Sequence, residues 1–256
     1  MATAKAKTAA KPEAKSGTLQ YPKNGTVLGV LSFPLWNESD IDALAKWRQE
    51  KNIKPGQYPD RIGGSLFITQ AEVDRVQKYL VEVFVPFTVE QYAHTNGTKG
   101  FSPEVAEALI ELINAEDWTE TNLPIRDLSD KDLENLGEDT DFVAKLVFSG
   151  SQGNEIQKKA LTREDPDNPK SSLVVIDLDS VPGIGDPDRL WWGARNWFKG
   201  AFNMNAYTRE VQVGKQKVLV HGISAYSRFL YLRTDLEMNF GGGNDDEQVL
   251  EEDFED

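Results

Sequence analysis

The second half of the chain carries short stretches in which β-branched and aromatic residues run together or alternate with polar ones. Clusters of Gly, Pro, Asn and Asp separate these stretches, which is typical of strands joined by turns. Many short strands with few helices between them favour a mainly β structure, either a small barrel or a sandwich. The strands predicted in this half cover residues 142–148, 172–176, 200–207, 217–225 and 229–232.

The first half of the chain mixes strand and helix signals. Residues 26–34 are apolar and β-branched and end at a proline, so we predict a strand there. Residues 39–51 begin with a serine that can cap a helix and continue with a partial apolar stripe. Thr69 and Glu72 have the spacing of a capping box, which predicts a helix towards residue 81. Residues 81–89 fit either a continuation of that helix or a strand.

An acidic stretch at 101–140 carries two further helix starts. Ser102, followed by a proline and a glutamate, has the residue order of a capped helix. Ser129 and Asp132 form a second capping pattern, and Gly137 is placed to end that short helix. The stretch holds twelve acidic and two basic residues. We therefore predict an acidic helical insertion in the β domain.

Strand alternation sorts several residues by face. Phe202 and Tyr207 fall on opposite faces of the strand at 200–207, so we expect Phe202 in the core and Tyr207 at the surface. In the strand at 217–225, Lys217 leads a polar face that lies opposite a valine-rich one.

The 256 residues could form one large domain or two small ones, and the hydrophobic fraction of 39% is ordinary. We predict a disordered basic arm at 1–23, one domain at 24–240 and a disordered acidic tail at 241–256. No apolar run is long enough to span a membrane, and the N-terminus lacks the apolar core of a secretory signal. The absence of cysteine excludes disulfides and thiolate zinc sites and fits a reducing cytoplasm.

Charge is sorted along the chain. The net charge of −14 includes −8 from the last thirteen residues and −10 from 101–140. Residues 189–233 carry eight basic residues against one acid, Glu210. A polyanionic tail behind a basic segment indicates a nucleic-acid groove with a tethered competitor.

The basic segment also holds nine aromatic residues, interleaved with its cations. Single-stranded nucleic acid needs both residue types, because cations neutralise phosphates and flat rings stack on unpaired bases. A strand-rich core also needs aromatics, so we expect about half of the nine to be buried. The DNA-binding candidates chosen from composition are Trp192, Arg195, Trp197, Lys199, Lys217, Tyr226 and Arg228.

Two other function classes stay open. Asp177 and Asp179 follow an apolar strand and could hold Mg²⁺ in a metal-dependent nuclease, although the same sequence is typical of a turn. Alternatively, the chain is an acidic protein-interaction adaptor that never touches DNA. His94 and His221 have no partner at metal-ligand spacing, so we predict no metal, no cofactor and no catalytic residue.

Several motifs together resemble a known family, the small replication single-stranded-DNA-binding proteins of tailed phages. The resemblance covers residues 141–233, the opening strand and the acidic tail with its near-terminal Phe254, and it does not account for 52–140. The motifs that carry it are TVLGVLSFP, VVIDLDSVPGIGDP, WWGAR, GAFNMNAY and KVLVHGISAYSRF.

The resemblance implies an OB-like fold, a five-stranded Greek-key barrel that binds single strands across one face. It implies a non-enzymatic protein that coats single-stranded DNA in phage replication, recombination and repair, in the cytoplasm of the infected bacterial cell. It places Lys145, Tyr207 and Arg209 at the DNA and leaves a homodimer open. The acidic tail is expected to compete for the DNA groove and to contact a replicative polymerase or helicase through Asp253, Phe254, Glu255 and Asp256.

Overall fold

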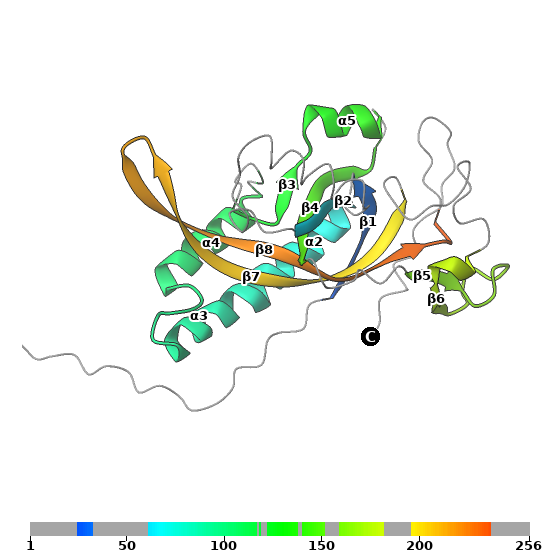
Figure 1. Cartoon of the computed structure of the whole chain (residues 1–256), viewed down its shortest axis with the longest axis horizontal. Coiled ribbons are helices and arrows are strands. Elements are labelled where there is room, and N and C mark those ends of the chain that lie inside the picture. Colours follow the sequence, from blue (N-terminus) through cyan, green and yellow to red (C-terminus); the bar gives the residue numbers. More distant parts are fainter. Residues whose placement is uncertain are drawn as a thin grey trace, which may run out of the picture.

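The centre of the molecule is a closed five-stranded β-barrel (Figure 1). The computed structural model describes residues 25–32, 61–116, 118, 122–137, 140–151, 159–181 and 196–236. The barrel strands are β1 (Thr26–Ser32), β2 (Arg61–Thr69), β4 (Phe142–Ser151), β7 (Trp197–Val213) and β8 (Gln216–Arg233).

The barrel strands follow one another in the order β1–β2–β4–β8–β7, and β7 returns to pair with β1. All of these pairings are antiparallel except that of β4 with β8, where Phe148 lies opposite Ala225. Closing the sheet in this way removes the exposed edges of its strands. The OB-like barrel with helical insertions predicted from the sequence is confirmed.

The barrel interior is filled by alternate residues of its strands. Leu66 of β2, Leu146 of β4 and Phe202 of β7 are fully buried in the main core. The ring of Phe148 packs against that of Phe202, with 5.1 Å between their centres. The expectation that Phe202 belongs to the core is confirmed.

A helical insertion joins β2 to β4 and packs against the barrel (Figure 1). Val73, Val76 and Leu109 of its helices lie in the same core as the barrel strands. None of the helices in the described part of the chain is long and apolar enough to span a lipid bilayer. The insertion consists of α2 (Gln70–Tyr79), the π-helical turn η1 (Leu80–Phe84), α3 (Val85–His94), α4 (Pro103–Asn114), β3 (Ile125–Asp127) and α5 (Asp130–Leu136).

The strand alternative for residues 81–89 is wrong, because this stretch continues the helix. Leu80, Phe84 and Phe87 are all buried at spacings of four and three residues, which is the periodicity of a helix face. The β-branched residues between them were therefore a weaker signal than the spacing of the buried ones.

Two of the three helix caps predicted within the described residues are present, and the helix predicted at 39–51 with its serine cap lies outside them. The Val105 N–H donates to Ser102 Oγ at 3.4 Å at the start of α4. At the start of α5, Ser129 and Asp132 form a capping box. Gly137 ends α5 with a positive φ of 91°, as expected.

The third predicted cap, at Thr69 and Glu72, is wrong: Thr69 precedes α2 but its side chain makes no capping hydrogen bond. Glu72 instead accepts a hydrogen bond from the Leu28 N–H and pairs with Arg75, whose Nη1 donates to Thr26 O at 3.0 Å. The two side chains thereby make hydrogen bonds to backbone groups of β1 that lie beyond its pairing with β2. Burial raises the pKa of Glu72 to about 7 against the opposing effect of Arg75.

Two features extend beyond the barrel. The strands β5 (Lys159–Arg163) and β6 (Leu173–Asp177) form a hairpin that pairs with β8, followed by the short 3₁₀ turn η2 (Leu178–Ser180). At the other end, β7 and β8 run past the barrel as a two-stranded ribbon, residues 207–222 (Figure 1). The strands predicted at 217–225 and 229–232 are thus one strand, irregular opposite Ala201.

Candidate nucleic-acid interface

One row of side chains crosses the outer face of the barrel over five strands. Trp197 of β7 lies opposite Val30 of β1, and Val30 lies opposite Phe67 of β2. The row continues from Phe67 to Lys145 of β4, and from Lys145 to Arg126 of β3. Residues directly opposite each other point to the same face of a sheet, so these rings and cations share one surface. We call these five residues the outer row.

Helix α5 covers part of the outer row. Its Leu136 packs with Val30, Phe67 and Phe142 in an apolar cluster that is separate from the main core. The Phe142 ring lies 5.4 Å from that of Trp197 and 6.3 Å from that of Phe67, measured between ring centres. Phe67 is only 5% exposed as a result. The aromatic part of the outer row therefore lies beneath the insertion.

The lysine of the outer row is also engaged by α5. Lys145 Nζ donates to Asp132 Oδ2, and the same oxygen accepts from the Ser129 N–H at 2.9 Å and from Ser129 Oγ at 2.6 Å. Burial acts to raise the pKa of Asp132, but these hydrogen bonds hold it below its ordinary value. Lys145, which the family resemblance places at the DNA, is thus paired with a carboxylate here.

The ribbon has two faces of different character. On one face Tyr207 lies opposite Gly222, and Arg209 lies opposite Val220. The Tyr207 ring lies so close to Gly222 that a Cβ at this glycine would sit 2.6 Å from it. The guanidinium carbon of Arg209 lies 5.6 Å from the centre of the Tyr207 ring, within the range of a cation–π contact. We call this side of the ribbon the tyrosine face.

The opposite face of the ribbon carries paired polar side chains together with the exposed Leu219. Lys217 Nζ donates to Glu210 Oε2 at 2.8 Å, with both side chains largely exposed. Thr208 Oγ1 and His221 Nδ1 lie at hydrogen-bond distance, 2.9 Å. Strand alternation correctly predicted a polar face led by Lys217. That face points away from Arg209, so the two candidate cations of the ribbon do not share a surface.

Arg126 connects the outer row to the tyrosine face. It is half-buried, and burial lowers the pKa of its guanidinium. The nearby positive charge of Arg209 lowers this pKa further, whereas Tyr207 acts in the opposite direction. Because Asn122 bonds β3 to the base of the ribbon, Arg126 lies where the outer row and the tyrosine face adjoin.

Asn122 holds β3 beside the base of the ribbon. Its backbone oxygen accepts from the Ile223 N–H at 2.7 Å, and its Nδ2 donates to the His221 oxygen at 2.9 Å.

Arg126 was missed from the sequence because it lies within the acidic stretch at 101–140. Its position, directly after an apolar proline–isoleucine step that begins a strand, was the local signal available.

The remaining described candidates lie elsewhere on β7 and β8. Lys199 lies opposite Leu28 of β1 and is close enough to Glu72 to lower its pKa. Tyr226 lies opposite Asn203 and is half-buried, and Arg228 is exposed. Tyr226 shares the face of the β7–β8 pair that carries Tyr207, two residue pairs further along, whereas neither Lys199 nor Arg228 lies in the ribbon beside Tyr207 and Arg209. Trp192, Arg195 and the predicted partner-binding residues Asp253, Phe254, Glu255 and Asp256 lie outside the described residues, as does the basic arm at 1–23.

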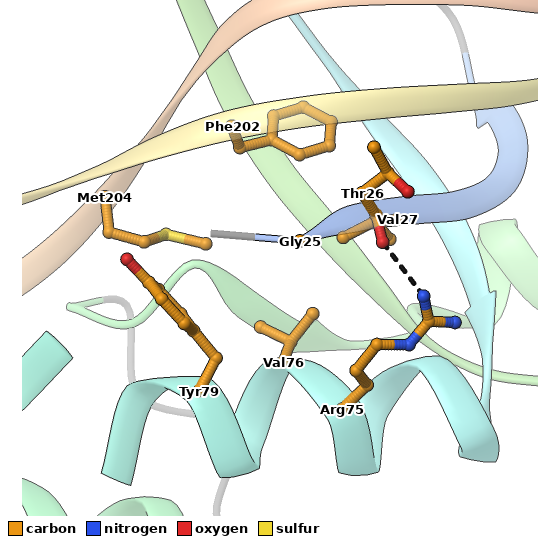
Figure 2. Close-up of a pocket in the computed structure, with 8 residues that line it drawn as sticks. All are labelled: Gly25, Thr26, Val27, Arg75, Val76, Tyr79, Phe202 and Met204. Carbon is orange, nitrogen blue, oxygen red and sulfur yellow. Dashed lines mark hydrogen bonds between the residues drawn. The ribbon is translucent and has the colours of Figure 1, made fainter. Parts of the chain in front are cut away.

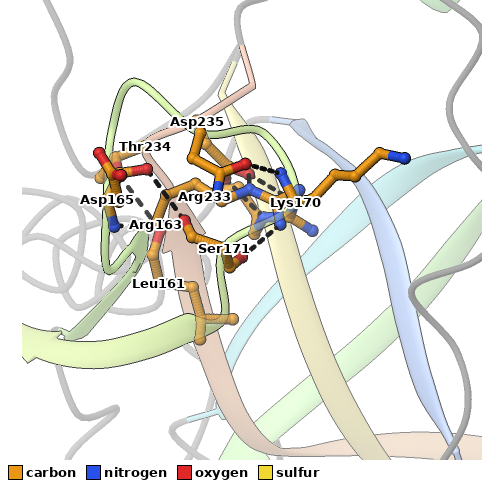
Figure 3. A network of polar contacts seen from close by, with 9 residues as sticks. Leu161, Arg163, Asp165, Lys170, Ser171, Arg233, Thr234 and Asp235 are labelled. Atoms are coloured by element: carbon orange, nitrogen blue, oxygen red, sulfur yellow. Dashed lines mark hydrogen bonds and ion pairs between the residues drawn. The ribbon is translucent and has the colours of Figure 1, made fainter.

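One cation of the basic segment serves the fold instead. Arg233 is 6% exposed, and its Nε and Nη2 donate to the two carboxylate oxygens of Asp235, each at 2.8 Å (Figure 3). Arg163 of β5 pairs with the same carboxylate at 3.2 Å and donates to Ser171 O at 2.8 Å. Burial acts to raise the pKa of Asp235, but the two arginines hold it below its ordinary value. This network fastens the β5–β6 hairpin to the end of β8.

A cavity of about 30 Å³ lies between α2 and the barrel. Val76 and Tyr79 of α2 face Phe202 and Met204 of β7 across it (Figure 2). This volume suits a single water molecule rather than a nucleotide. The cavity is therefore a packing feature.

The nuclease alternative rests on two acids that lie at and just after the end of β6. Asp177 lies at the end of β6 opposite Lys159, and Asp179 lies in the turn η2. Within the described ranges, no three His, Asp or Glu side chains lie close enough to hold a metal ion. His94 ends α3, and His221 contacts Thr208 on the ribbon.

Comparisons with protein-family models, with curated proteins and with solved structures find no match to this chain. Its chemistry is therefore inferred from its own residues.

Proposed function

We propose that this protein binds single-stranded DNA without reading its base sequence and without catalysing a reaction. The observation that carries the proposal is the tyrosine face, where the Tyr207 ring and the Arg209 guanidinium lie together and Arg126 is close to both. Unpaired bases offer flat faces to a ring, and the backbone offers phosphates to the guanidinium groups. Neither contact depends on which base is present.

The OB-like barrel supports the same proposal. In OB folds, single strands bind across the sheet face and the loop that joins the last two strands. Here that loop is the ribbon, and the sheet face carries the outer row. The tyrosine face and Arg126 lie where these two surfaces meet.

The acidic residues 244–256 and the resemblance to phage replication proteins support a biological role. We propose that the protein coats single-stranded DNA in phage replication, recombination and repair, in the cytoplasm of the infected cell. In this proposal the tail competes with DNA for the cationic surface, and DNA binding frees Phe254 and its neighbours for a replicative polymerase or helicase.

The test is a fluorescence-anisotropy titration of labelled oligo(dT) at low and high salt. We expect binding that weakens with salt, no cleavage when Mg²⁺ is added, and weak binding to a duplex. Tyr207→Ala should weaken binding about 5- to 150-fold, because one base stack contributes about 1–3 kcal/mol. Arg126→Ala should weaken binding and also reduce its salt dependence.

Tyr92→Ala is the matched control, because Tyr92 is also half-buried but lies on α3. It should leave oligo(dT) affinity unchanged. Absence of binding at low salt would leave the adaptor interpretation, and cleavage lost in Asp177→Asn would favour the nuclease.

A further inference from the structure

We propose that α5 is a removable cover, and that the barrel face beneath it is a second binding surface for single-stranded DNA. This inference rests on the proposed function and names a further site for the same ligand. When α5 lifts, the outer row becomes continuous with the tyrosine face through Arg126. The track available to a strand then extends from the ribbon across the barrel.

The covered surface has the chemistry that a single strand needs. Three aromatic rings form a contiguous group: the centre of the Phe142 ring is 6.3 Å from that of Phe67 and 5.4 Å from that of Trp197. Lys145 lies directly opposite Phe67, and Arg126 lies directly opposite Lys145. Rings beside a line of cations are the usual arrangement of a surface that binds bases and backbone together.

The contacts of α5 imitate those of the strand that it would exclude. Its Asp132 carboxylate occupies Lys145, where a phosphate would bind. Its Leu136 lies on Phe67 and Phe142, where a base would stack. The helix carries three acids, Asp130, Asp132 and Glu134, against a single lysine, so it is itself a short polyanion.

The cover is held by few contacts. The helix is seven residues long, and only Asp132 and Leu136 of these are buried. Leu133 is 44% exposed although it is apolar. A helix this short is not stable on its own, so its position depends on the Lys145 ion pair and on the Leu136 contact. A ligand that replaces both contacts can displace it.

The test compares two variants of α5 that lose the same charge. Asp132→Asn weakens the contact with Lys145, whereas Glu134→Gln removes a carboxylate from the same helix that is exposed. If the cover is closed most of the time, Asp132→Asn should bind oligo(dT) about three- to ten-fold tighter, because apparent affinity follows the open fraction. Glu134→Gln should stay within about two-fold of the unchanged protein.

Leu136→Ser is the second variant, because it loosens the cover without changing charge. It should lower local packing and still increase oligo(dT) affinity, a combination that a merely structural helix would not produce. Hydrogen exchange gives an independent readout: amides of 130–136 should exchange faster when oligo(dT) is bound, while those of the barrel strands are unchanged or slower.

The outcomes separate this inference from the proposed function. Equal oligo(dT) affinity in all variants, or a lower affinity in Asp132→Asn, would contradict the proposal that α5 is a cover but not the proposed function. Equal tightening in Asp132→Asn and Glu134→Gln shows a general charge effect and also overturns the cover. No binding by any variant removes the proposed function, and the cover falls with it.

Discussion

The ribbon and the outer face of the barrel carry the same two kinds of side chain in different surroundings. On the ribbon, Arg209 is exposed and lies over Tyr207. On the barrel, Lys145 is bound by Asp132, and Phe142 lies beneath Leu136. A ring beside a cation is therefore an incomplete description of a binding surface, because the neighbouring elements decide whether a ligand can reach it.

The largest expected difference between the two regions is in stability. Phe142→Ala should lower the free energy of unfolding by about 3–5 kcal/mol, because it removes a buried ring and leaves a cavity. Tyr207→Ala should cost less than about 1 kcal/mol, because that ring is only half-buried on the ribbon. Urea unfolding followed by circular dichroism measures both. Similar losses in the two variants would mean that the ribbon is as tightly packed as the barrel face.

Two carboxylates of the helical insertion have pKa values shifted in opposite directions and give a prediction on pH. The pKa of Asp132 is lowered by its hydrogen bonds, whereas burial raises that of Glu72 to about 7 from an ordinary value of 4.5. A raised folded pKa favours the protonated form, so this contribution to stability is complete below about pH 4.5 and is lost as the pH rises through 7.

Glu72→Gln removes that titration. From about pH 5 to about pH 8, the free energy of unfolding of the variant should rise relative to that of the unchanged protein by on the order of 3 kcal/mol. Unfolding at a series of pH values measures the difference. If the unfolding free energy of the variant minus that of the unchanged protein stays constant or falls with rising pH, Arg75 keeps Glu72 ionised in the folded protein.

A smaller effect is expected when the two faces of the ribbon are compared. Arg209→Ala should weaken oligo(dT) binding by roughly three- to ten-fold, because it removes a guanidinium from the tyrosine face. Lys217→Ala loses the same charge from the opposite face, where the lysine is paired with Glu210, and should change affinity by less than about two-fold. Anisotropy titrations at one salt concentration compare them. Equal losses would show that only the net charge of the ribbon matters.

The smallest effect is expected from the acidic tail. Deleting residues 244–256 should tighten oligo(dT) binding by about two- to five-fold at low salt and by less at high salt, because the competing charges are then screened. Titrations of the full and shortened chains at two salt concentrations test this. An unchanged affinity at low salt would remove the tail from the competition.

Local sequence signals predicted those parts of the fold whose partners lie a few residues away. The Ser129–Asp132 cap and the alternation that buries Phe202 are of this kind. The cap predicted at Thr69 and Glu72 was wrong because a distant strand, β1, provides Glu72 with a different partner. The parallel pairing of β4 with β8 that closes the barrel has no local signal, and the family resemblance implied only the five-stranded barrel and not this pairing.

The site was predicted less completely, for the same physical reason. Tyr207 and Arg209, which the family resemblance places at the DNA, lie in contact, but composition could not show that Lys217 faces away or that Arg233 is buried with Asp235. Arg126 was missed because an acidic average over its segment hid a single cation. Its surroundings depend on contacts between segments about a hundred residues apart along the chain, which no window of sequence contains.

The two hydrogen bonds between Asn122 and the base of the ribbon have a mechanical consequence. These bonds attach the insertion to the projecting strands, so the direction of the ribbon is set partly by a loop outside it. Any movement that tilts the ribbon must stretch or break these two hydrogen bonds. A substitution at Asn122 would remove only the side-chain bond, because the bond from Ile223 is made by the backbone, and would loosen the direction of the ribbon while every side chain on its surface remains the same.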